Sequence, residues 1–253
     1  MKKGTKFMFP TEDLMNLFRI NDSLKISENI KKLIDEKLYK LFNNKRPVDP
    51  ALGETLTYWQ YWLHTATIKH GQILEEVVLE LCKEKLKNFK VWEDRDFRVT
   101  QRALNIAADP QQDILKVKLP YPGKTKKSIQ IDMLIYDTKN KTLNSYEIKR
   151  GSGTHDRQKK EKMLQDLLTT HMHLESYGKE EKKLEIKEVN SYIISVFGKE
   201  LLSPEWKKFS INGFEEINKH FKTDISKGIE DSNTYFRNLL IQNANKKFSK
   251  KEI

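Results

Sequence analysis

Hydrophobic and polar residues alternate most regularly between residues 129 and 150, where the pattern predicts two neighbouring β-strands. The run 129–136 has an isoleucine or methionine at every second position, which is the period of two that a strand imposes on its faces. The run 143–150 places polar side chains at every second position on one face. The polar segment 137–142 lies between them, and Asn140 favours a turn there. Together these parts predict a β-hairpin.

Stretches with apolar residues at helical spacing predict helices on both sides of the hairpin. We expect helix at residues 11–43, one or two helices within 55–87, and further helices at 156–177 and 235–248. Two short apolar runs, 89–92 and 189–197, predict additional strands. This order predicts an α/β (α+β) fold, in which a mixed β-sheet of four or more strands is flanked by helices.

The predicted hairpin brings three ionisable side chains to one face. If the loop is 138–141, residue 137 pairs with 142, and Asp132 then stands opposite Glu147. Lys149 follows on the same face. Two carboxylates so placed repel each other, and a sheet tolerates them only when a cation or a shared proton lies between them. The pattern therefore predicts a site for a hard divalent cation and an activated water.

The charge of the chain indicates an anionic partner. Its 253 residues include 47 Lys and Arg against 36 Asp and Glu, a formal net charge of +11, which is typical of proteins that bind nucleic acid. Basic residues placed on phosphates release counterions and add affinity. Those nearest the hairpin in the sequence are the ones that we expect to contact phosphate: Lys126, Lys127, Arg150, Arg157, Lys159 and Lys160.

Asp132, a turn and the triplet Glu147-Ile148-Lys149 resemble the motif of the PD-(D/E)XK nuclease superfamily. Ile131 stands where the family has a proline, a position to which no catalytic role belongs. Upstream, Gly71 and Glu75 are similar to the G-xxx-E arrangement that the family often carries on the helix before the sheet. The resemblance covers residues 64–197 and is strongest to type II restriction endonucleases.

Helical spacing favours Glu75 over its neighbour Glu76 for the upstream position. Glu75 is in line with Ile68, Leu79, Cys82 and Leu86, whereas Glu76 is in line with polar and charged residues. A carboxylate on an apolar stripe needs a partner, and a metal site would supply one. The alternative is that Glu75 is an ordinary carboxylate on the surface of a helix.

The resemblance implies a Mg²⁺-dependent endonuclease, with Mn²⁺ as a substitute. Asp132, Glu147 and the carbonyl of Ile148 would bind the metal, Glu75 would bind a second one, and Lys149 would orient the attacking water. The implied substrate is double-stranded DNA, cut at a specific sequence by a homodimer. The implied organisation is a nuclease core at 64–200 between helical regions at 1–63 and 201–253.

Other interpretations stay open at this point. A repair, transposon-end or other defence nuclease would have the same core. A non-cleaving nucleic-acid-binding protein could retain the scaffold. Asp132 and Glu147 could instead be edge-strand charges that keep a hairpin soluble, with Lys149 as their salt-bridge partner. His171 and His173 are two residues apart on a predicted helix, so their rings diverge, and we expect surface or packing roles for them.

Three features bear on location. No stretch approaches the roughly 20 apolar residues of a membrane span. The first residues contain an apolar run too short for a signal peptide. Cys82 is the only cysteine, which excludes a disulfide framework and a cysteine-based zinc site. We therefore expect a cytoplasmic protein without a membrane partner.

Overall fold

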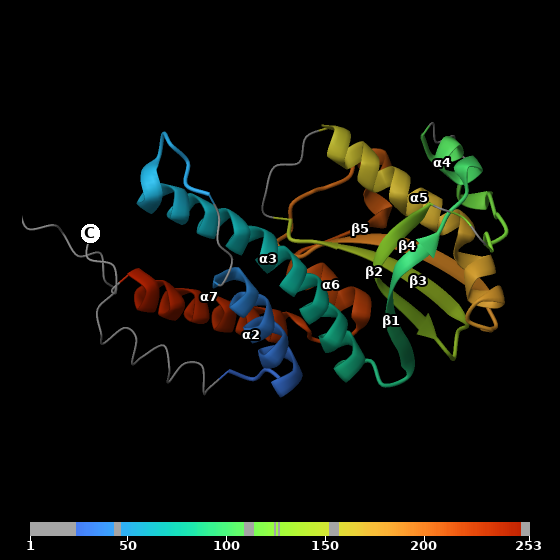
Figure 1. Ribbon diagram of the computed structural model, residues 1–253. Coiled ribbons are helices and arrows are strands. Elements are labelled where there is room, and N and C mark those ends of the chain that lie inside the picture. The colour runs from blue at the N-terminus through green and yellow to red at the C-terminus, as the bar shows by residue number, and fades with distance from the viewer. Residues whose placement is uncertain are drawn as a thin grey trace, which may run out of the picture. The chain divides into compact units, whose positions relative to one another are not determined.

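The computed structural model describes residues 24–42, 47–108, 114–123, 125, 127–151 and 157–248 (Figure 1). The chain divides into two compact units, Met1–Val77 with Lys227–Ile253, and Val78–Ser226. The predicted boundaries at residues 63 and 200 stay a prediction. Lys126 and the predicted helical residues 11–23 lie outside the described residues. No described helix is long and apolar enough to cross a membrane.

The first unit is helical. It contains α2 (Glu28–Phe42), the larger part of α3 (Gly53–Lys85) and nearly all of α7 (Ser226–Phe248). The inward face of α2 is apolar at helical spacing, with Ile30, Ile34 and Leu38 buried. Polar contacts join the helices at their rims, since Lys37 Nζ lies 2.6 Å from Glu76 Oε1. The helical prediction within 55–87 corresponds to one helix, α3, which ends at Lys85, and the last helix begins earlier than residue 235.

The second unit is built on a five-stranded mixed sheet in the order β1-β2-β3-β4-β5. The strands are β1 (Phe89–Arg98), β2 (Ser128–Asp137), β3 (Thr142–Lys149), β4 (Glu188–Ser195) and β5 (Ser210–Asn212). The pairs β1–β2 and β2–β3 are antiparallel, and β3–β4 and β4–β5 are parallel. The other elements of this unit are α4 (Gln101–Ala108), η1 (Ile114–Lys116), α5 (Arg157–Glu180), η2 (Pro204–Phe209) and α6 (Gly213–Phe221). The predicted mixed sheet with flanking helices is confirmed.

The β2–β3 hairpin has the predicted register. Asp137 pairs with Thr142, and the ladder continues to the pair of Met133 and Tyr146. The turn forms because Asp137 Oδ1 accepts hydrogen bonds from the main-chain amides of Lys139 and Asn140 at 2.9 and 3.0 Å. The positive φ of Lys141, 59°, completes the reversal of the chain.

Helices cover both faces of this hairpin. On one face α5 packs its apolar side, including Leu174 and Tyr177, against Leu134 and Leu143. On the other face Tyr146 packs against Phe221 of α6, with ring centroids 5.5 Å apart and planes inclined by 51°. Residues 131–136 of β2 are therefore buried without interruption. The edge-strand interpretation of Asp132 and Glu147 is wrong, because β2 and β3 are interior strands of the sheet.

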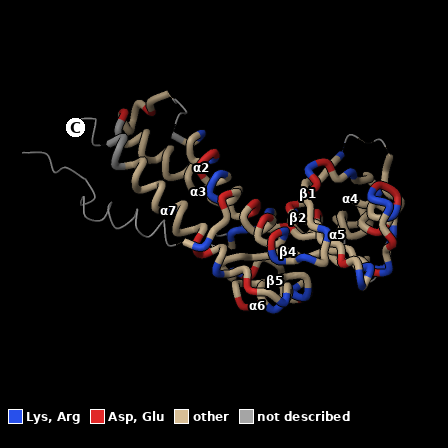
Figure 2. Tube along the Cα trace, turned by 90° about the horizontal axis from the view of Figure 1, so that it is seen from below, with Lys and Arg blue, Asp and Glu red and all other residues tan. Residues whose placement is uncertain are grey.

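Each of the three parallel strands is followed closely by a glycine with positive φ. These residues are Gly151 after β3, Gly198 after β4 and Gly213 after β5, with φ values of 69°, 82° and 77°. The carboxyl ends of parallel strands lie at the same edge of a sheet. This edge is where β3 ends in Lys149. In Figure 2, basic residues lie among acidic ones in this unit and are not gathered in a single basic segment.

A substitution at Gly151 tests whether the close packing at this edge of the sheet requires a glycine. Gly151→Ala should lower the free energy of unfolding by about 2 to 4 kcal/mol, because an L-residue is strained at this φ and the new Cβ would overlap Ser195 Oγ. Gly71→Ala is the control, since a Cβ at Gly71 meets no atom within 4 Å. In the interior of a helix that change should be neutral or stabilise by about 0.5 to 1 kcal/mol. Chemical denaturation of both variants checks the expectation, and equal stabilities would contradict it.

Candidate active site on the hairpin

Asp132 is a buried carboxylate held by the neighbouring strand. It is 7% exposed, and its Oδ2 accepts a 2.7 Å hydrogen bond from the main-chain amide of Ile148. Its Oδ1 accepts a second hydrogen bond from Gln130 Nε2 at 3.2 Å. The backbone ladder between β2 and β3 runs as far as Met133 and Tyr146, and the Asp132 side chain links the strands beyond that pair. Both bonds stabilise the ionised form of a carboxylate.

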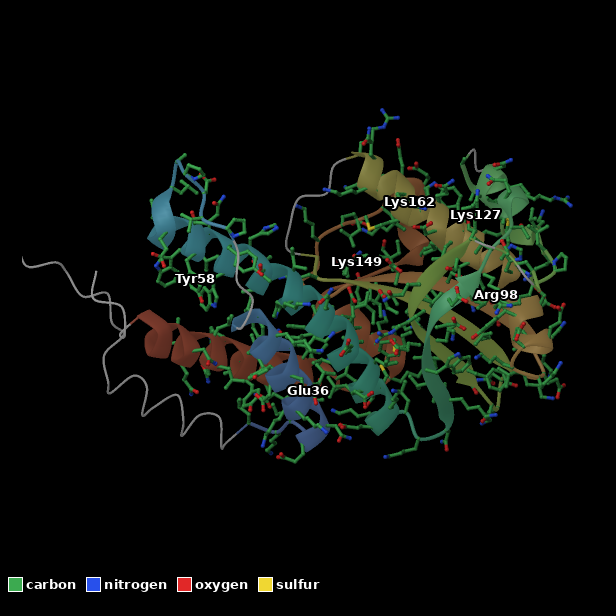
Figure 3. All side chains as sticks on the ribbon, in the orientation of Figure 1. Glu36, Tyr58, Arg98, Lys127, Lys149 and Lys162 are labelled. Atoms are coloured by element: carbon green, nitrogen blue, oxygen red, sulfur yellow. The ribbon has the colours of Figure 1, made fainter. Side chains whose placement is uncertain are left out.

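Glu147 and Lys149 lie on the same face as Asp132. Lys149 Nζ is 2.5 Å from Glu147 Oε1 and 3.9 Å from Asp132 Oδ2. The side chains of Glu147 and Lys149 are 28% and 27% exposed, so solvent still reaches the outer part of this group. Figure 3 labels Lys149 at the end of β3. The structure therefore brings together the three ionisable residues that the sequence places on one face of the hairpin.

The environment of Glu147 disfavours its charge. Burial raises the pKa of Glu147 above its usual value, the negative charge of Asp132 raises it further, and Lys149 opposes both effects. A third carboxylate, Asp166, also raises this pKa. The carboxylates thus repel one another, and the single ammonium of Lys149 offsets only part of that repulsion.

Asp166 is a residue that the sequence analysis overlooks. It lies on α5, where its Oδ1 is 2.6 Å from Lys162 Nζ and its side chain is 26% exposed. With Glu147 and Gln130 it lines a cavity of about 20 Å³, enough for one water molecule. The signal was present, since Asp166 is three residues after the inward-facing Met163 and four before Thr170.

Glu75 stays a prediction as a site residue. It is half-buried on the part of α3 that belongs to the first unit, whereas the hairpin belongs to the second. The stripe proposed for it is only partly buried, since Leu79 and Cys82 are buried but Ile68 is 49% exposed. The line of polar and charged residues on α3 predicts that Glu76 faces solvent, whereas its side chain is only 25% exposed and is paired with Lys37 of α2.

The predicted phosphate contacts have varied surroundings. Lys127 Nζ donates a hydrogen bond to Gln101 Oε1, and Arg157 Nε pairs with Glu161 at 2.7 Å. Arg150 Nε is buried and has no hydrogen-bond partner among the described residues. Lys159 is exposed and Lys160 is half-buried in the first turn of α5. Contact of any of these residues with phosphate stays a prediction.

The donor atoms of the hairpin suit a hard cation in kind. Asp132 and Glu147 supply carboxylate oxygens, and Ile148 between Glu147 and Lys149 supplies a main-chain carbonyl. Within the described ranges no group of three or more His, Cys, Asp or Glu side chains is arranged to hold a metal ion. Mg²⁺ is commonly held by one or two carboxylates while it retains several waters, so two carboxylates and a carbonyl fit that ion.

His171 and His173 are both buried within α5 packing. His173 Nδ1 donates to the Pro120 carbonyl at 3.0 Å, which leaves Nε2 to accept from the Thr100 amide at 3.3 Å. Burial, helped by the charge of Lys118, lowers the pKa of His171 to about 4. Packing roles are therefore confirmed for both residues, and surface roles are wrong.

The lowered pKa of His171 predicts a loss of stability in acid. The folded state holds this ring neutral, whereas the unfolded chain protonates it near pH 6.5. The neutral ring makes its full contribution to the free energy of unfolding above that pH. As the pH falls towards 4, about 3 kcal/mol of this free energy is lost. His171→Gln should flatten the dependence of unfolding free energy on pH over this window. His64→Gln, at an exposed position, should leave that dependence unchanged, and equal pH profiles for the two variants would refute the assignment.

The raised pKa of Glu147 predicts an effect of opposite sign. A carboxyl with a raised pKa in the folded state contributes stability below its unfolded pKa and loses it as the pH rises through the folded value. Glu147→Gln should therefore raise the thermal midpoint by a few degrees at pH 7 and by less at pH 4. Glu185→Gln removes an exposed carboxyl whose pKa Lys141 lowers, and it should not raise the midpoint at pH 7. Thermal unfolding at pH 7 and pH 4 measures whether Glu147→Gln raises the midpoint, and a lower midpoint at pH 7 would contradict the prediction.

Compared with known proteins, the chain matches no family model, no curated protein and no solved structure. A functional assignment therefore depends on the chemistry of the hairpin and on the resemblance of its motif.

Proposed function

We propose that this protein is a metal-dependent endonuclease that hydrolyses phosphodiester bonds of DNA, with its active site on the β2–β3 hairpin. One observation carries the proposal. Lys149 Nζ lies 2.5 Å from Glu147 Oε1 and 3.9 Å from Asp132 Oδ2 on two interior strands. Grouped, half-buried charges contribute little net stability, whereas perturbed carboxylates cluster at catalytic sites. Asp132, Glu147 and Lys149 also follow one another in the sequence as the corresponding residues of the PD-(D/E)XK motif do.

Asp132 and Glu147, with the Ile148 carbonyl, would hold Mg²⁺, for which Mn²⁺ would substitute. When bound, the cation supplies an activated water and offsets charge on the scissile phosphate. Asp132 provides a rigid oxygen, because the Ile148 amide fixes its carboxylate. Glu147 is disposed to pair with added positive charge, because its neighbours disfavour its ionisation. Lys149 donates N–H groups from a flexible stem and stabilises negative charge that develops on the phosphate.

The resemblance of the motif and the net charge of the chain support a more specific proposal for the substrate and the type of nuclease. An excess of 11 positive charges favours a polyanionic substrate. A type II restriction enzyme that cuts double-stranded DNA as a homodimer is the form that we propose, in the cytoplasm. The role of Glu75 as a ligand of a second metal stays a prediction from the resemblance. A repair, transposon-end or other defence nuclease would have the same core and the same chemistry but a different DNA target.

A second candidate is a nucleic-acid-binding protein that does not cleave. The position of Lys149 favours it, because an ammonium 2.5 Å from Glu147 already neutralises one carboxylate without a metal. Such a protein would bind DNA with an affinity that falls with salt and would leave it intact in Mg²⁺.

Cleavage of plasmid DNA tests the proposal. Mg²⁺ or Mn²⁺ should support cleavage, and EDTA should abolish it. Asp132→Asn, which can still accept the Ile148 hydrogen bond, should reduce the cleavage rate by roughly 100-fold or more, because it removes a charged ligand of the metal. Lys149→Ala should have an effect of similar size, because it removes a positive charge that stabilises the reacting phosphate. Lys179→Ala, which removes a lysine paired with Glu175 elsewhere on α5, should retain the wild-type rate within about twofold.

Thermal unfolding of the same variants separates loss of function from loss of fold. Folded Asp132→Asn and Lys149→Ala proteins that cut at the wild-type rate would refute the site. Salt-sensitive DNA binding without cleavage by the wild-type protein would favour the second candidate.

A further inference from the structure

A cleft of about 930 Å³ lies in the second unit, apart from the hairpin site. Its walls come from the end of α4, the first turns of α5 and the segment around η2. Arg157, Lys160 and Lys162 line it from α5, and Trp206 lines it from η2. Its volume is in the range of pockets that hold small organic ligands.

Trp206 is an aromatic surface held in a fixed orientation. Its ring stacks on Phe209, with centroids 5.9 Å apart and planes inclined by 27°. It also packs against the apolar core that contains Leu201 and Leu202, and it is half-buried. A tryptophan that is supported on one side and lines a cleft on the other can stack with a nucleobase, which contributes about 1 to 3 kcal/mol per base.

The carboxylates of Glu161 and Glu205 also line the cleft, and Lys160 is the basic residue of its lining that has no ion pair among the described residues. Arg157 pairs with Glu161 at 2.7 Å, and Lys162 pairs with Asp166 at 2.6 Å. Lys160 is half-buried and forms no ion pair with any residue that the structure describes. An ammonium in such a position gains from an anionic ligand, since burial has removed part of its hydration. The cleft thus combines a stacking surface with a site for one negative group.

Helix α5 connects the cleft to the hairpin. Lys162 lines the cleft, and its partner Asp166 lines the small cavity beside Glu147. The two sites therefore contact residues one helical turn apart on one element. A strand of nucleic acid that occupies the cleft can extend along α5 towards the hairpin.

We infer that the cleft binds one unpaired nucleotide of a DNA strand, with its base on Trp206 and its phosphate at Lys160. The inference rests on the proposed function, since it names a feature of that substrate. Both faces of a base inside a duplex are covered by its neighbours, so only an unstacked base can lie on the indole. Among the forms of the proposed function, the inference favours a repair or other defence nuclease, whose DNA substrate has a single-stranded segment beside the cut, over a restriction enzyme that cuts intact duplex.

Binding without cleavage tests the inference. The probe is fluorescent oligo(dT) of about 12 nucleotides, long enough for a single-strand site, and anisotropy is measured in EDTA. Trp206→Leu should weaken binding by about tenfold, and Trp206→Phe, which retains a ring, by less than threefold. Lys160→Ala should weaken binding several-fold and reduce its salt dependence by about one phosphate contact. Lys207→Ala, an exposed lysine of η2 beside Glu200, is the matched control and should change little.

The outcomes separate this inference from the proposed function. Loss of binding in Trp206→Leu and Lys160→Ala supports the cleft whether or not the protein cleaves DNA. Wild-type protein that does not bind oligo(dT), or cleft variants that bind as the Lys207 control does, would overturn the inference. Blunt duplex bound as tightly, with the same dependence on Trp206, would also overturn it.

Discussion

The hydrogen bond from the Ile148 amide to Asp132 Oδ2, at 2.7 Å, is the interaction on which the rest of the site depends. It spans two strands at the point where their backbone ladder has ended, and it buries a carboxylate in the middle of a sheet. Burial of a carboxylate without such a donor costs several kcal/mol. Because the amide belongs to the residue between Glu147 and Lys149, the same bond sets where those two side chains emerge.

The surroundings of the hairpin explain why this arrangement persists. Interior strands cannot slide without moving apolar side chains out of two packed faces. Helix α5 adds Asp166 to one face, and α6 closes the other through Tyr146. The charged group is thus confined to one end of β3, where Glu147 and Lys149 are each about a quarter exposed. Rigid strands and partial access to solvent are the two conditions that a preorganised polar site requires.

Much of the second unit was predictable from local pattern. The alternation within 129–150 and the turn chemistry of Asp137 were sufficient to predict the register of the hairpin, because both are short-range properties. Burial of β2 on both faces was not predictable from that alternation, because the covering helices are distant in sequence. The same limit applies to Asp166 and Trp206, whose importance arises only when α5 packs on the sheet and η2 packs beside α4.

The glycines at 151, 198 and 213 have a consequence for what can approach the sheet. Each stands where a parallel strand ends, and Gly198 and Gly213 come close enough that a Cβ on one would touch the Cα of the other. Gly151 is buried against Ser195, so no other group can enter between the segments that leave β3 and β4 at that point. Main chain closes this edge from within, and an incoming molecule meets it only from outside, where Lys149 at the end of β3 is about a quarter exposed.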